Sequence, residues 1–254
     1  MDAVWHPLAA ELARWHDCGR QIRFWLRDDD AVTPTPALER LVRLGRDNAV
    51  PVTLAVIPLL AKEALAEWLA NEEGITVTVH GWSHRNHASI AEKKQELGPH
   101  RPRPTITNEL RNGVERIGAL FPRRFLPVLV PPWNRIDPSL VPELPALGFE
   151  GLSVFGPVKA VQKAILPVIN THIDLMDWHG TRGCRPHGEL VEEIVRALRQ
   201  RFDGGAEPIG ILAHHLVHDE SAWLFLEGLF EIVAASSSVR WAPLSELIDY
   251  NSTT

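Results

Sequence analysis

The sequence predicts an α/β fold in which seven to eight parallel strands form a closed or nearly closed barrel. Two observations predict it. Apolar and β-branched runs alternate with helical patterns about eight times along the 254 residues, which is typical of a parallel sheet covered by helices. Polar clusters also stand directly after the strands, and a barrel would gather them on one face. An open, doubly wound sheet is the alternative, but it would spread these clusters along a line.

The expected strands are short runs of β-branched, aromatic and aliphatic residues, most of them followed by polar or turn-forming residues. A mostly apolar run suits a strand that is buried on both sides, as strands of parallel sheets are. The eight expected strands span residues 22–27, 52–57, 75–80, 125–130, 149–155, 166–175, 209–213 and 239–243.

Apolar residues at spacings of three and four predict the helices between the strands. A threonine N-cap followed by Pro36 favours a helix start there, and Gly148 favours a helix end. Segment 88–103 is polar and rich in proline and glycine, so we expect much of it to form a loop over a site. The expected helices span residues 3–16, 37–47, 59–71, 107–120, 138–147, 188–202 and 222–235.

Composition excludes several classes of protein. Hydrophobic residues make up 45% and charged residues 23%, as in a globular protein with a large core. We therefore expect residues 1–254 to form one domain, with a helix in residues 1–20 that closes one end of the barrel. The net charge of −6 and the lack of a basic tract argue against nucleic acid. No apolar run is long enough to span a membrane, and the first residues lack the pattern of a signal peptide, so a cytoplasmic location is expected. Cys18 and Cys184 are too few for a disulfide framework.

Three histidines stand at or just after the end of the third expected strand, within eight residues. His80 and His84 are four residues apart, so one helical turn would place both rings on one face. Neutral imidazole is a ligand for zinc and neighbouring metals. The spacing alone is equally compatible with one partly buried and one solvated histidine.

Three consecutive aspartates, residues 28–30, follow the first strand. Adjacent side chains cannot all point the same way, so they must serve different partners. Taken alone they suit a solvated acidic turn or a helix cap. Beside two histidines, one aspartate would complete a metal site with open positions for water and substrate, and a second would act as general base.

Five short motifs occur in a fixed order within residues 22–245. They are Asp28-Asp29, His80-x-x-x-His84, Pro131-Pro-Trp133, Asp177-Trp178 and Leu212-Ala-His214. In type and order they resemble the motifs of the polysaccharide deacetylase family, also called the NodB-homology or carbohydrate esterase family 4 group. The resemblance implies a distorted (β/α) barrel, often with seven strands, and a divalent metal, usually zinc, held by one aspartate and two histidines. It also implies that water attacks an N-acetyl carbonyl and that a late histidine protonates the leaving amine.

Carried over by position, the resemblance assigns a role to each motif residue. Asp28 resembles the general base, and His214 resembles the general acid. Asp29, His80 and His84 resemble the metal ligands.

The remaining assignments concern support and substrate. Asp177 resembles the later aspartate that orients the acidic histidine. Trp133 resembles an aromatic of the groove wall that stacks on a sugar, and Asn134 and Trp82 are the other predicted substrate contacts.

The sequence departs from the family pattern at several positions. Asp30 replaces the usual glycine after the aspartate pair, where it would compete as a ligand or shift the pKa of its neighbours. Val130 replaces the usual arginine that positions the base, and Arg27 and Arg135 are candidate substitutes. Consecutive strand residues point to opposite faces, so either His214 or the residue after it faces the metal.

The predicted function is therefore metal-dependent hydrolysis of a C–N amide bond, with an N-acetylated sugar or polysaccharide as the expected substrate. A small-molecule amidase that opens a cyclic ureide or imide is an alternative on the same fold. A non-catalytic carbohydrate-binding protein is the alternative from another class, and the altered residues Asp30 and Val130 motivate it.

Overall fold

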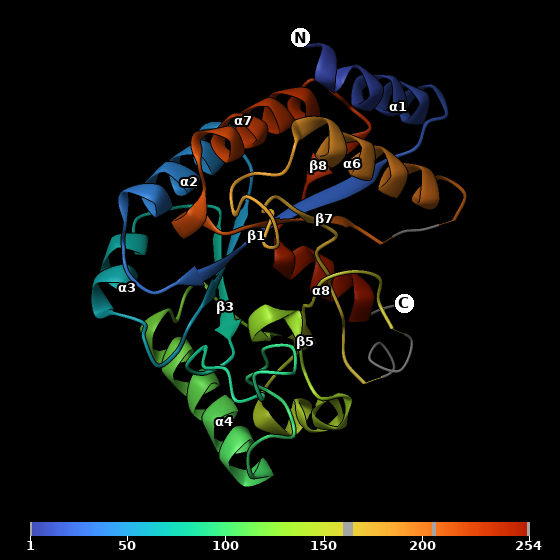
Figure 1. Ribbon diagram of the computed structural model, residues 1–254. Coiled ribbons are helices and arrows are strands. Elements are labelled where there is room, and N and C mark those ends of the chain that lie inside the picture. Colours follow the sequence, from blue (N-terminus) through green and yellow to red (C-terminus); the bar gives the residue numbers. More distant parts are fainter. Residues whose placement is uncertain (1, 160–164, 205–206, 253–254) are drawn as a thin grey trace.

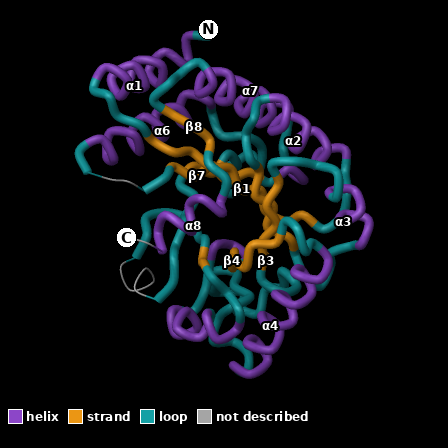
Figure 2. Tube along the Cα trace, turned by 180° about the vertical axis from the view of Figure 1, so that it is seen from behind, coloured by secondary structure: helices purple, strands orange, loops and turns teal. Residues whose placement is uncertain are grey.

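A computed structural model of the chain describes residues 2–159, 165–204 and 207–252. Its centre is one parallel sheet that curls into a distorted half-barrel, which confirms the predicted fold class (Figures 1 and 2). Seven strands are paired in the order β5-β4-β3-β2-β1-β7-β6, and β8 pairs with the beginning of β1. The strands are β1 (Ile22–Ala31), β2 (Val52–Val56), β3 (Ile75–His80), β4 (Phe125–Val130), β5 (Gly151–Leu152), β6 (Ile173–Asp174), β7 (Ile209–Ala213) and β8 (Val239–Trp241).

Helices cover the outside of the sheet, as the alternating pattern predicts (Figure 2). The outer helices are α1 (His6–Asp17), α2 (Pro36–Asp47), α3 (Glu63–Leu69), α4 (Arg103–Leu120), α6 (His187–Phe202) and α7 (Glu220–Ala234), and a further helix is α8 (Leu244–Ser252). Short 3-10 turns lie at η1 (Ala3–Trp5), η2 (Pro132–Asn134), η3 (Pro138–Glu143), η4 (Pro145–Leu147) and η5 (His215–Val217). No helix in the described part of the chain has both the length and the apolar composition needed to cross a bilayer.

The core has two parts, on the two faces of the sheet. Most apolar residues pack between the strands and the outer helices. The smaller part lies inside the curl of the sheet, where Trp25 and Val128 pack against Leu247 and Ile248 of α8. Gly151 permits this contact, because a Cβ there would lie 2.7 Å from the Ile248 side chain. Helix α8 thus fills the interior of the half-barrel, while α1 packs outside against α6.

The observed elements differ from the expected ones in a few places. Strands β3, β4 and β7 have the expected bounds, but β1 extends to Ala31 and so includes the three aspartates. Strands β5 and β6 have two residues each, and isolated bridges continue their pairing, such as that between Leu152 and Val168. Residues 138–147 form two 3-10 turns because Pro142 and Pro145 remove the backbone donors of a regular helix. Helix α8 was not predicted.

All strands of the sheet are parallel, so their carboxyl ends meet at one edge. The ends of β1, β3, β4, β6 and β7 therefore bring together residues that lie up to 187 positions apart in sequence. This edge carries the polar residues described next.

Candidate active site

A bulge at the end of β1 separates the three aspartates. The pairing of β1 with β2 shifts between Asp28 and Ala31, so one extra residue stands on β1. Asp30 occupies this bulge with a φ of 75°, a left-handed conformation that costs a non-glycine residue free energy. The bulge breaks the alternation of the strand, so Asp28, Asp29 and Asp30 each meet a different partner.

Asp30 is the aspartate that meets the two histidines. Its Oδ1 lies 3.2 Å from Nε2 of His80 and 3.3 Å from Nε2 of His84. His80 stands at the end of β3 and is buried, whereas His84 lies in the following turn with a φ of 56°. The structure therefore brings together Asp30, His80 and His84 as a group that could hold a metal ion. The family resemblance predicts Asp29 as the third ligand, whereas the carboxylate beside the two histidines is that of Asp30.

The donor set of this group fits a divalent cation. Nδ1 of His80 lies 2.9 Å from the carbonyl oxygen of Val130, which can only accept, so Nδ1 carries the hydrogen. The lone pair of Nε2 then faces Asp30, whose buried Oδ1 makes no hydrogen bond. Such lone pairs repel one another unless a cation or a proton lies between them. One carboxylate and two imidazoles are a ligand set that zinc accepts.

The electrostatic environment of the group is set by burial and by neighbouring charges. Burial opposes ionisation of Asp30, but the ring nitrogen of His80 and the charges of His84 and His214 outweigh it and hold the pKa of Asp30 well below its usual range. Burial also opposes the charged form of His80, but Asp29 and Asp30 outweigh it and raise its pKa. Burial, with the nearby His80, lowers the pKa of His84.

Asp29 is held by an arginine two residues earlier on the same strand. Side chains at i and i+2 share a face of a strand, so Arg27 reaches Asp29 with two hydrogen bonds, of 2.9 and 3.0 Å. Arg27 is fully buried and also donates to Ser153 at 2.7 Å and to Asn134 at 2.6 Å. Of the two candidate substitutes for the family arginine, Arg27 is the one that contacts an aspartate. Arg135, the other candidate, donates to the backbone of segment 88–103 instead.

Asp28 points to the opposite face of β1 and pairs with His215. Its Oδ2 lies 2.5 Å from Nδ1 of His215, and its Oδ1 accepts the backbone N–H of His215 at 2.7 Å. Both side chains are buried, with 0% and 1% exposure. The hydrogen bonds of the Asp28 side chain thus go to His215 and not to His80 or His84. The geometry therefore does not support the prediction of Asp28 as general base.

His214 lies next to this pair, at the end of β7, and stays partly exposed. Its ring packs edge-on against Trp178, with 4.7 Å between ring centroids. Burial raises the pKa of Asp174 against the opposing effect of His214, and Asp174 Oδ2 accepts a 2.8 Å hydrogen bond from Trp178. Asp177, which the sequence analysis assigned to this supporting role, instead accepts backbone N–H groups in an exposed turn over residues 177–181.

The predicted substrate contacts surround this edge of the sheet. The ring centroids of Trp133 and His84 are 4.4 Å apart. Both Trp133 and Asn134 have left-handed backbones, with φ of 55° and 56°. The carbonyl of the Asn134 side chain is occupied by Arg27. Trp82 is half-buried in the turn between His80 and His84.

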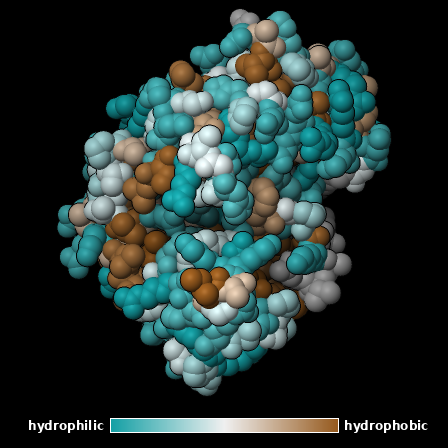
Figure 3. All heavy atoms as spheres, viewed as in Figure 1, coloured by the Kyte–Doolittle hydropathy of each residue, from teal (hydrophilic) through white to brown (hydrophobic). Residues whose placement is uncertain are grey.

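Several large apolar side chains are exposed beside the same edge. In the view of Figure 1, the surface is hollowed near its middle and is mostly hydrophilic, with apolar patches at intervals (Figure 3). Exposed apolar residues that follow strand ends are Leu59, Leu60, Trp178, Leu216 and Val217. The carboxyl edge of the sheet therefore offers both polar and apolar contacts to a bound molecule.

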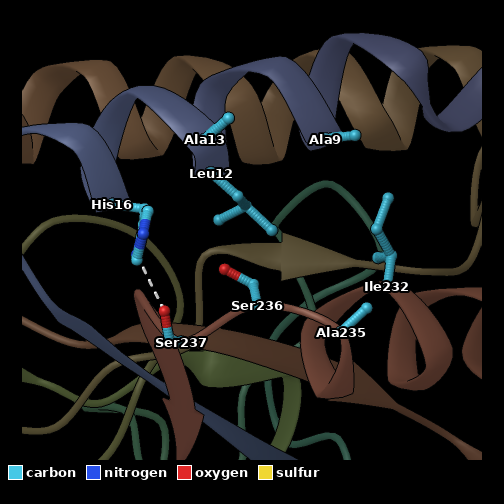
Figure 4. A pocket seen from close by; sticks show the side chains of 8 residues that line it. All are labelled: Ala9, Leu12, Ala13, His16, Ile232, Ala235, Ser236 and Ser237. Carbon is cyan, nitrogen blue, oxygen red and sulfur yellow. Dashed lines mark hydrogen bonds between the residues drawn. The ribbon is translucent and has the colours of Figure 1, made fainter.

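A cavity of about 310 Å³ lies elsewhere, between α1 and the end of α7 (Figure 4). It is lined by side chains such as Leu12 and Ile232, and a 2.8 Å hydrogen bond joins His16 to Ser237 at one side. These residues adjoin the beginning of β1 rather than its end, since the backbone of Ile22 bonds to Ser238. The cavity is therefore remote from the aspartates and histidines.

Sequence reasoning missed several residues that the structure places at this site. Asp174 stands three residues before Asp177, the predicted supporting residue, and residue type alone does not distinguish the two aspartates. Glu96, which accepts the N–H groups of Trp82 and Ser83, lies in a segment expected to be a loop. His215 is the alternative to His214 that the sequence leaves open. The sequence does indicate Asp30 as a possible metal ligand and Arg27 as a possible substitute for the family arginine.

Comparison with known proteins supports the fold. No protein-family model matches the sequence, and no curated protein matches it. Among solved structures, a Mycobacterium smegmatis protein with a provisional assignment as a polysaccharide deacetylase is 15% identical, with a TM-score of 0.68 over 92% of this chain and 91% of that one. A family 4 carbohydrate esterase from Streptomyces lividans is 13% identical, with a TM-score of 0.56 over 88% and 95%. The peptidoglycan deacetylase PdaC from Bacillus subtilis is 15% identical, with a TM-score of 0.54 over 92% of each chain.

Proposed function

We propose that this chain, whose fold is shared with polysaccharide and peptidoglycan deacetylases, is a divergent metal-dependent deacetylase that hydrolyses the amide of an N-acetylated sugar. One observation carries the proposal. The group of Asp30, His80 and His84 lies at the carboxyl edge of the sheet, with a second carboxylate, Asp29, beside it and His214 nearby. A metal site, a base and an acid are the parts that hydrolysis of an amide needs.

Asp30, His80 and His84 would hold the cation, with zinc as the first candidate because of the two imidazole ligands. The chemistry that such a cation supplies when bound is polarisation of the amide carbonyl and a lowered pKa of water. The hydrogen bond from His80 to the carbonyl of Val130 fixes the ring so that Nε2 is the ligand atom.

Asp29 is the proposed general base. Its charge acts on His80, which places it beside the metal group, and Arg27 fixes its orientation through two hydrogen bonds. In the reaction, Asp29 takes a proton from water while the water oxygen forms a bond to the acetyl carbon. This assignment replaces Asp28, whose side chain pairs with His215, whereas the charge of Asp29 acts on the proposed ligand His80.

His214 is the proposed general acid. As the C–N bond breaks, His214 gives a proton to the leaving nitrogen, so the products are acetate and a free amine. Trp178 packs edge-on against the ring of His214 and donates a hydrogen bond to Asp174, so the aromatic ring beside the proposed acid is itself fixed.

Trp133 and Trp178 are the proposed walls of the substrate site. They contact His84 and His214 respectively, so a sugar ring placed between them would lie beside both the metal group and the acid. Aromatic faces stack on the apolar faces of sugars, which suits them to this role. Asn134 and Trp82 would complete the contacts from the neighbouring turns.

The test combines metal content with acetate release from N-acetylglucosamine oligomers. The wild type is expected to carry about one zinc per chain and to release acetate. Asp30→Asn should lose the metal, whereas Asp29→Asn and His214→Ala should keep it and lose turnover by about 10²- to 10⁴-fold. Asp177→Asn is the matched control and should leave both properties unchanged. A wild type that takes up no divalent metal on reconstitution would contradict the proposal. Activity confined to cyclic amides would contradict the sugar substrate and favour the alternative amidase.

A further inference from the structure

We infer that Glu96 is a positioning residue that fixes the turn carrying the ligand His84. The inference rests on the proposed function, because it takes His84 to be a metal ligand. Glu96 lies in segment 88–103. Its side chain forms hydrogen bonds with the turn itself and not with the ring of His84, although its charge also acts on that ring. Its role would be exerted through the backbone of the turn between the two histidines.

The carboxylate of Glu96 is fully buried and collects the donors of this turn. Its Oε2 accepts the N–H of Trp82 at 3.0 Å. Its Oε1 accepts the N–H of Ser83 at 2.8 Å, the hydroxyl of Ser83 at 2.7 Å and, more weakly, the N–H of Arg85 at 3.4 Å. Three backbone N–H groups on both sides of His84 are thus held by one side chain.

The backbone of this turn needs such support. Gly81 and His84 both have left-handed backbones, with φ of 57° and 56°, and for histidine this conformation costs free energy. Without Glu96, the N–H groups of Trp82 and Ser83 would lose the acceptors that they have in this turn. The bonds to Glu96 offset the cost of the conformation that points His84 at Asp30.

The Glu96 carboxylate is a charged group in a buried position, so its partners must stabilise the charge. No salt bridge to the Glu96 carboxylate occurs among the described residues, and all of its hydrogen bonds come from backbone N–H groups and one hydroxyl. Removing a carboxylate from water is costly without strong partners, and hydrogen bonds to a charged acceptor are stronger than those to a neutral one. A neutral amide would accept at one atom only and would present donors to the N–H of Trp82.

Glu96 is itself held in place by the segment that carries it. The next residue, Leu97, forms a bridge with Ile136, and its carbonyl accepts the N–H of Asp137 at 2.8 Å. Arg101 donates to the carbonyl of Glu96 at 3.4 Å. A Cβ at residue 81 would lie 2.1 Å from Oε2 of Glu96, so only glycine at that position lets the carboxylate approach.

The test uses Glu96→Gln, which keeps the size of the side chain, and Glu92→Gln as a control on the same segment. Glu92 is exposed and bonds to Ser89 and His100, away from the turn. Two quantities are measured: amide hydrogen exchange of Ser83 and Arg85 in the metal-free protein, and zinc affinity by competition with a chelator. Glu96→Gln should speed exchange at both amides at least tenfold and weaken zinc binding about 10- to 100-fold. Glu92→Gln should change neither.

Two further measurements separate positioning from a general loss of structure. The visible spectrum of bound Co²⁺ reports the ligand geometry and should change in Glu96→Gln but not in Glu92→Gln. If Glu96→Gln fails to fold, Ser83→Ala removes one donor to the same carboxylate and should weaken zinc binding by a few-fold with the fold retained. Unchanged zinc affinity and Co²⁺ spectrum in a folded Glu96→Gln protein would overturn the inference and leave the proposed function standing. A wild type that binds no zinc would overturn both the proposed metal centre and the role of Glu96 toward it, whatever the exchange rates.

Discussion

Asp28 and His215 form a buried pair that joins the ends of β1 and β7, with 2.5 Å between Oδ2 of Asp28 and Nδ1 of His215. The pair also fixes the backbone that follows His214, because the N–H of His215 donates to the same carboxylate at 2.7 Å. Burial opposes the charged form of His215, but Asp28 outweighs it and raises the pKa of His215. The pair therefore connects β1 to β7 next to His214, the proposed general acid.

Removal of one partner of this pair should destabilise the protein without loss of the metal. Asp28→Ala leaves His215 buried without its counter-charge, which for such pairs costs about 3–5 kcal/mol in the free energy of unfolding. Urea unfolding measures the effect, with the exposed Asp47→Ala as a control that should stay within about 0.5 kcal/mol. Wild-type stability combined with lost turnover in Asp28→Ala would instead identify Asp28 as the base.

Arg27 should be required for turnover although it touches no substrate. Arg27→Lys removes the two-pronged contact to Asp29 and the bond to Asn134, since an ammonium cannot reproduce the planar geometry of a guanidinium. We expect kcat to fall about 10- to 100-fold while zinc content stays at the wild-type level. Steady-state kinetics with metal analysis checks this. Equal kcat in the two proteins would show that Asp29 needs no support from Arg27.

Metal removal should lower both activity and stability. A ligand that binds only the folded state stabilises it by about 2.7 kcal/mol when its free concentration is 100 times its Kd. Dialysis against a chelator should therefore lower Tm, and added zinc should restore it. Asp30→Asn should have the same Tm with and without zinc, because the group formed with His80 and His84 is then incomplete.

Acid should destabilise the protein in part through His218. Burial lowers the pKa of His218 to about 4, and its Nε2 accepts the N–H of His214. Asp28, His214, His215 and Asp219 are the charged or titratable neighbours that act on it. The pKa of an unfolded histidine is about 6.5, so between about pH 6.5 and pH 4 the unfolded chain binds the extra proton.

The stability that a neutral His218 contributes is therefore present above pH 6.5 and is lost as the pH falls toward 4. His218→Gln cannot take up this proton but keeps an acceptor for His214. The loss of unfolding free energy between pH 7 and pH 5 should be smaller in His218→Gln than in the wild type. Urea titrations at the two pH values measure it, and parallel losses in both proteins would assign the acid sensitivity to other groups.

Helix α8 should contribute to stability from inside the half-barrel. Leu247 is fully buried against the inner face of the sheet, and truncation of such a leucine to alanine costs about 2–5 kcal/mol. Leu224→Ala on the exposed side of α7 is the control and should cost less than about 0.5 kcal/mol. Zinc affinity should be unchanged in both variants, because α8 lies away from His80 and His84.

The sequence predicts the fold well because parallel strands buried on both faces leave a strong apolar signal. Strands β3, β4 and β7 have the expected bounds for this reason. The short strands β5 and β6 are less regular, since single bridges between loops carry part of their pairing and leave no periodic pattern. Helix α8 was missed because its apolar residues are few and the segment lies close to the end of the chain.

The sequence predicts the candidate site at the carboxyl edge of the sheet, and there the structure brings Asp30, rather than the predicted Asp29, to the two histidines. Asp28-Asp29 and Asp29-Asp30 match an aspartate pair equally well, and alternation along a strand cannot choose between them. The choice is made by the bulge at Asp30, whose left-handed backbone no periodic rule predicts. Arg27 offers a local clue, because an arginine two residues before Asp29 shares its face of the strand.

The left-handed backbones of Asp30, His84, Trp133 and Asn134 have a consequence for laboratory evolution. Each such residue costs of order 1–3 kcal/mol relative to a relaxed conformation, and glycine would relieve that cost. A library screened for heat resistance alone would therefore enrich glycine at these four positions. The selected variants would be more stable to heat but would lack the proposed ligands and substrate contacts. Any such screen therefore needs a parallel selection for acetate release.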